Sequence, residues 1–268
     1  SDVELIKAVR KPAEKLNSWE AYQRGMWHML RHDPDSLRMA RTFFEMAVER
    51  DPTFASPLSE LARTYTQASA VFSDYPVEEA LNHAELAVRQ AIALDREHPG
   101  ARATLGQVLL LRGNLTGAVQ EAERSLALAS SCAEGYGVKG AALLALANFA
   151  EARNALHACI RIDPIGHPTP VRLSQIAAAH YFEADYDLAA GIARDVIQRS
   201  PTNPNGYRVL AASLGQLGEL RAANEAWTQY VDLNPSSIEL QIRHCPPWRL
   251  PAQHEHLQQG LRLAGWMD

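Results

Sequence analysis

The chain has 268 residues and a formal net charge of -5, with 47% hydrophobic and 7% aromatic residues. This apolar content suffices for one or two folded domains and excludes global disorder, while the acidic balance argues against a broad nucleic-acid-binding surface. Three scattered cysteines form no CxxC pair, which supports neither a disulfide framework nor a thiolate zinc site and favours a reducing, cytoplasmic compartment. We expect no transmembrane helix and no signal peptide, since the sequence contains neither a membrane-length apolar run nor a basic-then-apolar leader.

The first predicted element is an N-terminal segment, residues 1–16, in which a short helix over residues 2–10 is expected to end at Lys11-Pro12. From residue 17 on, one helical pattern recurs six times. Each unit places a small residue in its first helix and another in its second helix, with larger apolar residues beside them. The expected repeats are residues 17–52, 53–96, 97–130, 131–164, 165–201 and 202–235, and their first-helix small residues are Gly25, Ala62, Gly106, Gly140, Ala177 and Ala211.

Turn residues separate the expected helices. A residue before proline is driven out of the helical conformation, so the prolines at four repeat ends predict helix stops. Gly113-Asn114 and Gly218-Glu219 predict tight turns within repeats. Two turns are enlarged, by residues 66–76 and residues 165–168. The four stops are Asp51-Pro52, Asp163-Pro164, Ser200-Pro201 and Asn234-Pro235.

Residues 236–268 are expected to form a C-terminal cap. Residues 236–244 predict a short helix, and the prolines in Cys245-Pro246-Pro247-Trp248 require an irregular stretch. Residues 251–264 predict a further helix, because apolar side chains recur on one of its faces. Those side chains are Leu257, Leu261 and Ala264.

The repeating pattern resembles the tetratricopeptide repeat (TPR), whose period is 34 residues. Its clearest unit reads Tyr207-x-x-Leu210-Ala211-x-x-Leu214, then Ala223-x-x-x-Trp227 and Pro235. The resemblance implies an all-α fold, a right-handed α-α superhelix (TPR solenoid) of about six helix-turn-helix repeats with a C-terminal capping helix. Because one repeat cannot bury its apolar face alone, neighbouring repeats must stack.

The first helices of such repeats line a concave groove. By register, the groove residues should include Ser59, Arg63, Gln107, Ser174, Tyr181 and Arg208. The two arginines and the tyrosine suit an extended or helical protein segment that carries acidic groups. The alternative is a solvated inner face without a partner. The clamp by which some TPR proteins hold chaperone C-termini needs Lys and Asn where this chain has small or apolar residues, so chaperone binding is not expected.

Other candidate sites have an ordinary structural interpretation beside the functional one. Phe72 and Tyr75, in the enlarged turn of residues 66–76, form either a contact site or a loop packed on its own repeat. His28 and His32 share a helix face, but the pattern lacks the Glu of a metalloprotease motif. The tail residues His244, Cys245, His254 and His256 have no regular metal-ligand spacing. We therefore expect no catalytic residue, no cofactor and no metal site.

Two flanking segments resemble a narrower group. The stretch RKPAEKLNSWEAY at residues 10–22, followed by Arg24-Gly25, and GLRLAG at residues 260–265 are similar to those of bacterial signalling proteins. In that group a TPR array follows a class III adenylate/guanylate cyclase or a winged-helix transcriptional regulator. The resemblance implies a non-catalytic protein-protein interaction scaffold that regulates such a module and binds neither membrane nor nucleic acid itself. The alternatives are a self-association module that forms a homodimer and a free-standing adaptor.

Overall fold

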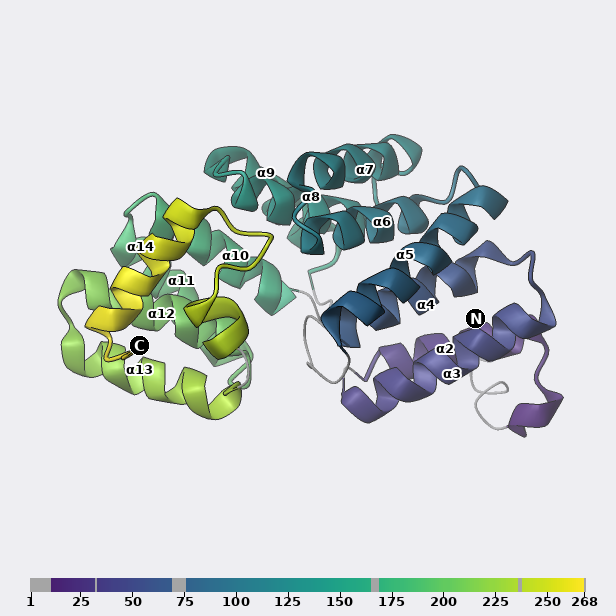
Figure 1. Ribbon diagram of the computed structural model, residues 1–268, viewed down its shortest axis with the longest axis horizontal. Coiled ribbons are helices and arrows are strands. Elements are labelled where there is room, and N and C mark those ends of the chain that lie inside the picture. Colours follow the sequence, from purple (N-terminus) through teal and green to yellow (C-terminus); the bar gives the residue numbers. More distant parts are fainter. Residues whose placement is uncertain (1–10, 32, 69–75, 165–168, 236–237, 268) are drawn as a thin grey trace. The chain divides into compact units, whose positions relative to one another are not determined.

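The computed structural model describes residues 11–31, 33–68, 76–164, 169–235 and 238–267 (Figure 1). Throughout these ranges the regular secondary structure is helical and contains no strand. The chain divides into two compact units. Unit 1 comprises Ser1–Leu111 and Gln120–Gly135, and unit 2 comprises Arg112–Val119 and Tyr136–Asp268.

Unit 1 begins with a short 3-10 helix, η1 (Ala13–Lys15). The helices that follow are α2 (Ser18–Met29), α3 (Pro34–Arg50), α4 (Ala55–Gln67), α5 (Val77–Leu94) and α6 (Pro99–Leu111). Helix α7 (Leu115–Leu128) has residues in both units, and α8 (Ala133–Ala145) lies largely in unit 2. The rest of unit 2 contains α9 (Phe149–Ile162), α10 (Thr169–Phe182), α11 (Tyr186–Arg199), α12 (Pro204–Leu217), α13 (Leu220–Leu233), the π-helix η3 (Ile238–Arg243) and α14 (Pro251–Leu263).

The predicted fold class is confirmed, because α2 to α13 follow one another as helix-turn-helix pairs and α14 comes after them. The predicted stops are also found: Asp51, Asp163, Ser200 and Asn234 each end a helix with a non-helical backbone directly before a proline. Residues 245–248 are irregular as expected, whereas the short helix predicted before them is π-helical. The helix expected over residues 2–10 lies outside the described residues.

The start of α2 is fixed by local hydrogen bonds. The Asn17 side chain accepts from the Glu20 backbone N–H, and the Glu20 carboxylate accepts from the Asn17 N–H, both at 2.8 Å. This reciprocal pair is a capping box, which satisfies two amides that a helix start would otherwise leave unpaired. The adjacent Leu16 is fully buried in unit 1. The N-terminal segment is therefore anchored to unit 1 through Leu16, whereas η1 before it buries no residue.

The small residues allow close helix packing within each unit. In unit 1, a Cβ added at Gly25 of α2 would lie 2.5 Å from the ring of Phe44 on α3. In unit 2, a Cβ at Gly140 of α8 would lie 2.6 Å from Leu156 on α9. Ala177 and Ala211 are fully buried. A larger side chain at such positions would push the paired helices apart, which explains the periodic small residues.

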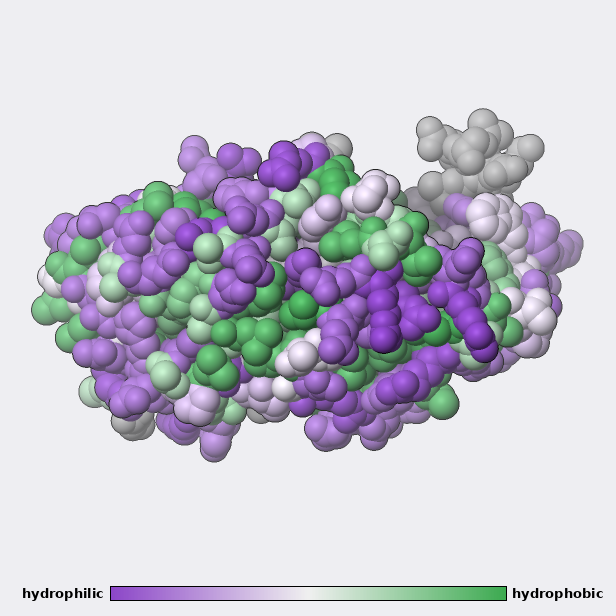
Figure 2. Space-filling view, turned by 90° about the horizontal axis from the view of Figure 1, so that it is seen from above, coloured by the Kyte–Doolittle hydropathy of each residue, from purple (hydrophilic) through white to green (hydrophobic). Residues whose placement is uncertain are grey.

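Hydrophobic side chains also reach the surface. On the face drawn in Figure 2 they are interspersed with hydrophilic side chains. Within the described ranges, no helix combines the length and the apolar character that a membrane span requires.

Among the described residues, four turns between helices contain a residue in the left-handed conformation. Gly113 and Gly218, which were predicted as turns, both have φ of 79°. Ala147 and Ala184 occupy the same conformation in the α8–α9 and α10–α11 turns, with φ of 61° and 63°. Alanine bears a steric cost there that glycine does not, so these two turns are strained.

Ala184→Gly is expected to raise the free energy of unfolding by about 1 kcal/mol, because glycine relieves that strain. Gly218→Ala is the matched opposite exchange. No atom lies within 4 Å of the Cβ position of Gly218, so backbone strain alone should lower its stability by a similar amount. Urea denaturation followed by circular dichroism measures both variants. A loss of stability in Ala184→Gly would contradict the assignment of strain.

Candidate functional site

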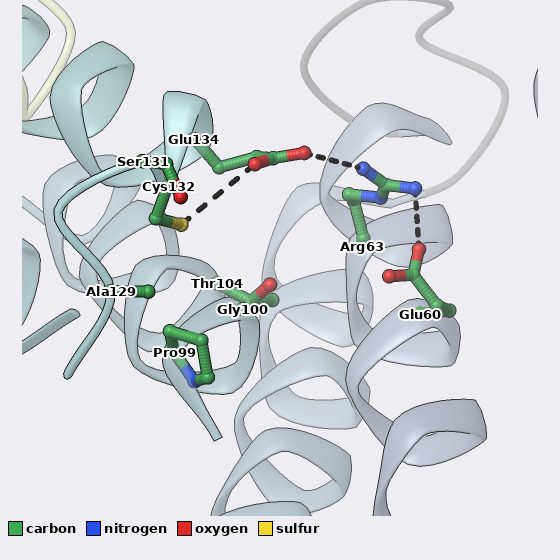
Figure 3. Close-up of a pocket in the computed structure, with 9 residues that line it drawn as sticks. All are labelled: Glu60, Arg63, Pro99, Gly100, Thr104, Ala129, Ser131, Cys132 and Glu134. Carbon is green, nitrogen blue, oxygen red and sulfur yellow. Dashed lines mark hydrogen bonds and ion pairs between the residues drawn. The ribbon is translucent and has the colours of Figure 1, made fainter. Parts of the chain in front are cut away.

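Unit 1 contains a cavity of about 280 Å³. It lies between the middle of α4, the start of α6 and the loop that leads into α8 (Figure 3). The predicted groove residue Arg63 points into it. The lining residues are Glu60, Arg63, Pro99, Gly100, Thr104, Ala129, Ser131, Cys132 and Glu134.

Arg63 is held between two carboxylates in this cavity (Figure 3). Its guanidinium lies 2.5 Å from Glu60, one turn away on α4, and 3.4 Å from Glu134 at the start of α8. The Cys132 thiol faces Glu134 at 3.8 Å and accepts a hydrogen bond from the Ser125 hydroxyl at 3.3 Å. These carboxylates outnumber the guanidinium, so Arg63 offers an incoming acidic group little uncompensated charge.

In unit 2 the C-terminal part of the chain lies on the first helices of the pairs. We call residues 238–266 the tail segment. Its helix α14 packs mostly on α12 and meets α13 only at its margin (Figure 1). Leu257, Leu261 and Ala264 are buried there, as their spacing predicted. The helix thus covers the side of α12 that was expected to line an open groove.

The backbones of α12 and α14 come very close together. A Cβ added at Gly215 of α12 would lie 2.3 Å from the carbonyl oxygen of Gly260 on α14. A Cβ added at Gly260 would lie 2.8 Å from the Ala212 carbonyl oxygen and 2.5 Å from the Tyr181 hydroxyl. Only glycine fits at either position without displacing a helix.

Two hydrogen bonds, one donated by the first helices and one donated by the tail segment, hold the tail segment in place. The Tyr181 hydroxyl of α10 donates to the His256 carbonyl at 2.6 Å, and the Gln253 amide donates to the Leu144 carbonyl of α8 at 2.8 Å. Burial raises the pKa of Tyr181, so its hydroxyl stays protonated and can donate. The face formed by α8, α10 and α12 therefore binds a helical segment.

The structure divides the six predicted groove residues. Ser59, Arg63 and Gln107 belong to unit 1, whereas Ser174, Tyr181 and Arg208 belong to unit 2. Ser59 and Ser174 are corrected from groove-lining to interior positions, because both are buried. Tyr181 is on the groove face of α10 but is covered by α14. Partner contact through Arg63, Gln107 and Arg208, which are partly exposed, stays a prediction. Phe72 and Tyr75 lie outside the described residues.

Two histidines of the tail segment, His254 and His256, take part in packing. His256 stacks on Tyr181 with ring centroids 4.6 Å apart, and its Nε2 lies 2.9 Å from the Tyr186 hydroxyl. His254 is buried beside Arg249. Near the other end of the chain, His28 stacks on Phe43. Among the residues that the structure describes, no three His, Cys, Asp or Glu side chains are grouped so as to hold a metal ion.

Acidification is expected to loosen the tail segment. Burial lowers the pKa of His256, and burial together with Arg249 lowers the pKa of His254, from the ordinary value of 6.5. The unfolded chain therefore binds protons more readily than the folded chain. Protonation of these histidines favours unfolding, so the free energy of unfolding decreases as pH falls below about 6.5. Proteolysis of α14 should accelerate between about pH 7 and pH 5. His256→Gln should weaken this pH dependence, and an unchanged pH profile in that variant would refute the assignment.

Sequence reasoning missed the seat of the tail segment. Its signals were present as glycines in the interiors of two helices, Gly215 and Gly260, where glycine weakens a helix unless close packing requires it. The two glycines lie far apart in the sequence, so local sequence patterns give no sign that they are in contact.

The comparisons with known proteins support the fold. No family model matches the chain, and no curated protein matches it. The Cut9 chain of the APC/C hetero-tetramer Cut9-Hcn1 is similar in structure, with a TM-score of 0.71 and 15% identity over 97% of this chain and 45% of that one. The chain thus spans less than half the length of that relative.

Two other solved structures are similar to this chain over most of their own length. PilW, a type IV pilus biogenesis factor, has a TM-score of 0.61 at 20% identity, covering 84% of this chain and 96% of that one. A thermophilic TPR protein from Thermus thermophilus has a TM-score of 0.58 at 18% identity, covering 74% and 98%. At these identities the likeness concerns the fold alone. The chain therefore has the fold of tetratricopeptide-repeat proteins.

Proposed function

We propose that this chain is a non-catalytic scaffold that binds a helical segment of another protein on the first helices of unit 2. The observation that carries the proposal is the seat of α14 on α12. The Tyr181 hydroxyl donates to a backbone carbonyl of α14, the Leu144 carbonyl of α8 accepts from a side chain of α14, and Gly215 admits a close helix. Backbone bonds and glycine contacts accept many sequences, so a partner helix with a matching small residue can take the same place.

The partner segment is proposed to carry acidic groups. Arg208 on α12 donates to the Gln241 side chain of the tail segment at 2.8 Å and has no carboxylate partner within the described ranges. When the tail segment leaves, Arg208 loses this neutral acceptor. An Asp or Glu of the partner would then form a charge-assisted hydrogen bond with it. Arg63 is less suited to this role because Glu60 and Glu134 already pair with it.

Competition between the tail segment and a partner tests this function. A synthetic peptide with the sequence of residues 249–268 is added to the full chain together with proteins from the source cell. We expect the peptide to displace a specific protein partner, and Arg208→Gln to weaken partner binding without loss of helicity. A partner that is retained at saturating peptide, or the absence of any specific partner, would overturn the proposal. Arg221→Gln, at an exposed position of α13, is the control variant.

The biological setting is proposed from the flanking segments. Residues 10–25 and 260–265 support a place as the cytoplasmic regulatory region of a bacterial signalling protein, beside a cyclase or a winged-helix regulator. In that setting partner binding controls the output of the neighbouring module. Sequencing the gene on both sides of the Ser1 codon tests the setting. A reading frame without either module would favour a free-standing adaptor.

Self-association is the second candidate, and the connection to α14 favours it. Residues 245–250 form an irregular link that contains Pro246 and Pro247, so α14 of one copy can reach the α12 seat of another copy by domain swapping. Light scattering across a range of concentrations tests this homodimer. A swapped dimer should disappear when α14 is tethered to α12 by an engineered disulfide, and a monomer at every concentration would exclude it.

A further inference from the structure

Two arginines meet where the tail segment joins α12. Arg208 of α12 donates from Nη1 to the Gln241 side-chain oxygen at 2.8 Å. Arg249, from the link before α14, donates from Nη1 to the backbone carbonyl oxygen of the same Gln241, also at 2.8 Å. Its Nη1 also lies 3.3 Å from His254 Nδ1. Both guanidiniums are partly buried, and both contact the same neutral residue.

This pair lacks a counter-charge. Over the described ranges, the hydrogen bonds of Arg208 and Arg249 go to Gln241 and His254, and neither arginine contacts a carboxylate. The acid of η3, Glu239, is paired with Arg243 and His244. Burial and the nearby charge of Arg208 lower the pKa of Arg249 to about 9. Two like charges that are partly removed from water cost free energy unless an anion joins them.

We propose that Arg208 and Arg249 form a binding site for a small oxyanion, a phosphate or a carboxylate. A guanidinium presents parallel N–H donors that match two oxygens of such a group, and each arginine has donors left after its bond to Gln241. One arginine belongs to α12 and the other to the tail segment. The bound oxyanion therefore holds the tail segment on its seat.

The ligand acts on partner binding through this link. An oxyanion that binds the tail-bound state must oppose any partner that needs the tail segment to leave, because coupling between two sites is reciprocal. This consequence rests on the proposed function, whereas the oxyanion site does not.

The site is tested on the full chain without a partner. Sodium phosphate, sodium acetate and sodium chloride are added at equal ionic strength while thermal unfolding is recorded. We expect a saturable rise of the melting temperature with phosphate or acetate beyond that with chloride, since ligand binding stabilises the folded state. Arg208→Gln should weaken the apparent affinity about tenfold or more. Arg243→Gln is the control, because Arg243 lies on the same segment but is paired with Glu239.

The arms of the experiment separate the possible sources. A response to phosphate alone assigns the site to phosphoryl groups, and a response to acetate assigns it to carboxylates. Arg249→Gln should also weaken the response. Arg249→Lys keeps the charge but loses the planar donor pair, so it should weaken the response too, and it replaces Arg249→Gln if that variant does not fold. Equal responses of the wild type, Arg208→Gln and Arg249→Lys, or a response no greater than that to chloride, would overturn the proposal. Failure to find a protein partner would leave this result intact.

Discussion

Replacing Gly215 with alanine is expected to destabilise unit 2 by about 2–3 kcal/mol and to release the tail segment. The added methyl group would lie 2.3 Å from the carbonyl oxygen of Gly260, which is backbone and cannot rotate away. Helix α14 must therefore move off α12. The buried Trp266 at the end of the tail segment reports this movement by its fluorescence. Limited proteolysis after residue 243 reports it independently.

Gly191→Ala is the matched control for this exchange. Gly191 lies within α11, and no atom occupies the space within 4 Å of its Cβ position. Alanine should therefore stabilise α11 by about 0.5–1 kcal/mol through its higher helix propensity. The same substitution is thus expected to have opposite effects at the two positions. Equal effects would show that α14 does not lie against α12 in solution.

Replacing Phe44 with alanine is expected to destabilise unit 1 by about 3–5 kcal/mol. Phe44 is fully buried between α2 and α3, and its ring fills the space left by Gly25. Removing the ring leaves a cavity that the two helices cannot fully close. Urea denaturation followed by circular dichroism measures the loss.

A double-mutant cycle tests the contact itself. Gly25→Ala alone should destabilise unit 1, because its Cβ would lie 2.5 Å from the Phe44 ring. In the Phe44→Ala background the same change meets no ring, so its cost should largely disappear. Additive effects of the two changes would contradict the packing of α2 on α3.

The helices could be predicted from the sequence because their boundaries are set locally. Proline, glycine and a capping asparagine act within a few residues, as at Asp51-Pro52, Gly218 and Asn17. The left-handed turns at Ala147 and Ala184 were missed, because alanine gives no local signal for that conformation. Tertiary packing imposes it there.

The candidate site could not be predicted to the same extent, because its contacts join distant residues. Glu134 lies 71 positions from Arg63 and neutralises an arginine that was expected to attract acidic groups. His256 lies 75 positions from Tyr181 and covers a side chain that was expected to be open. The repeat register placed the predicted residues on the first helices. It could not show which of their side chains another part of the chain already occupies.

Neither unit is a continuous stretch of the chain. Residues 112–119 of unit 2 interrupt unit 1, which is completed only by Gln120–Gly135. During translation the first residues of unit 2 are therefore synthesised before the last residues of unit 1. Unit 1 cannot finish folding until Gly135 has left the ribosomal exit tunnel. By then residues 112–119 have been made, but most of the unit 2 residues that they pack against have not. No single cut in the gene yields either unit whole.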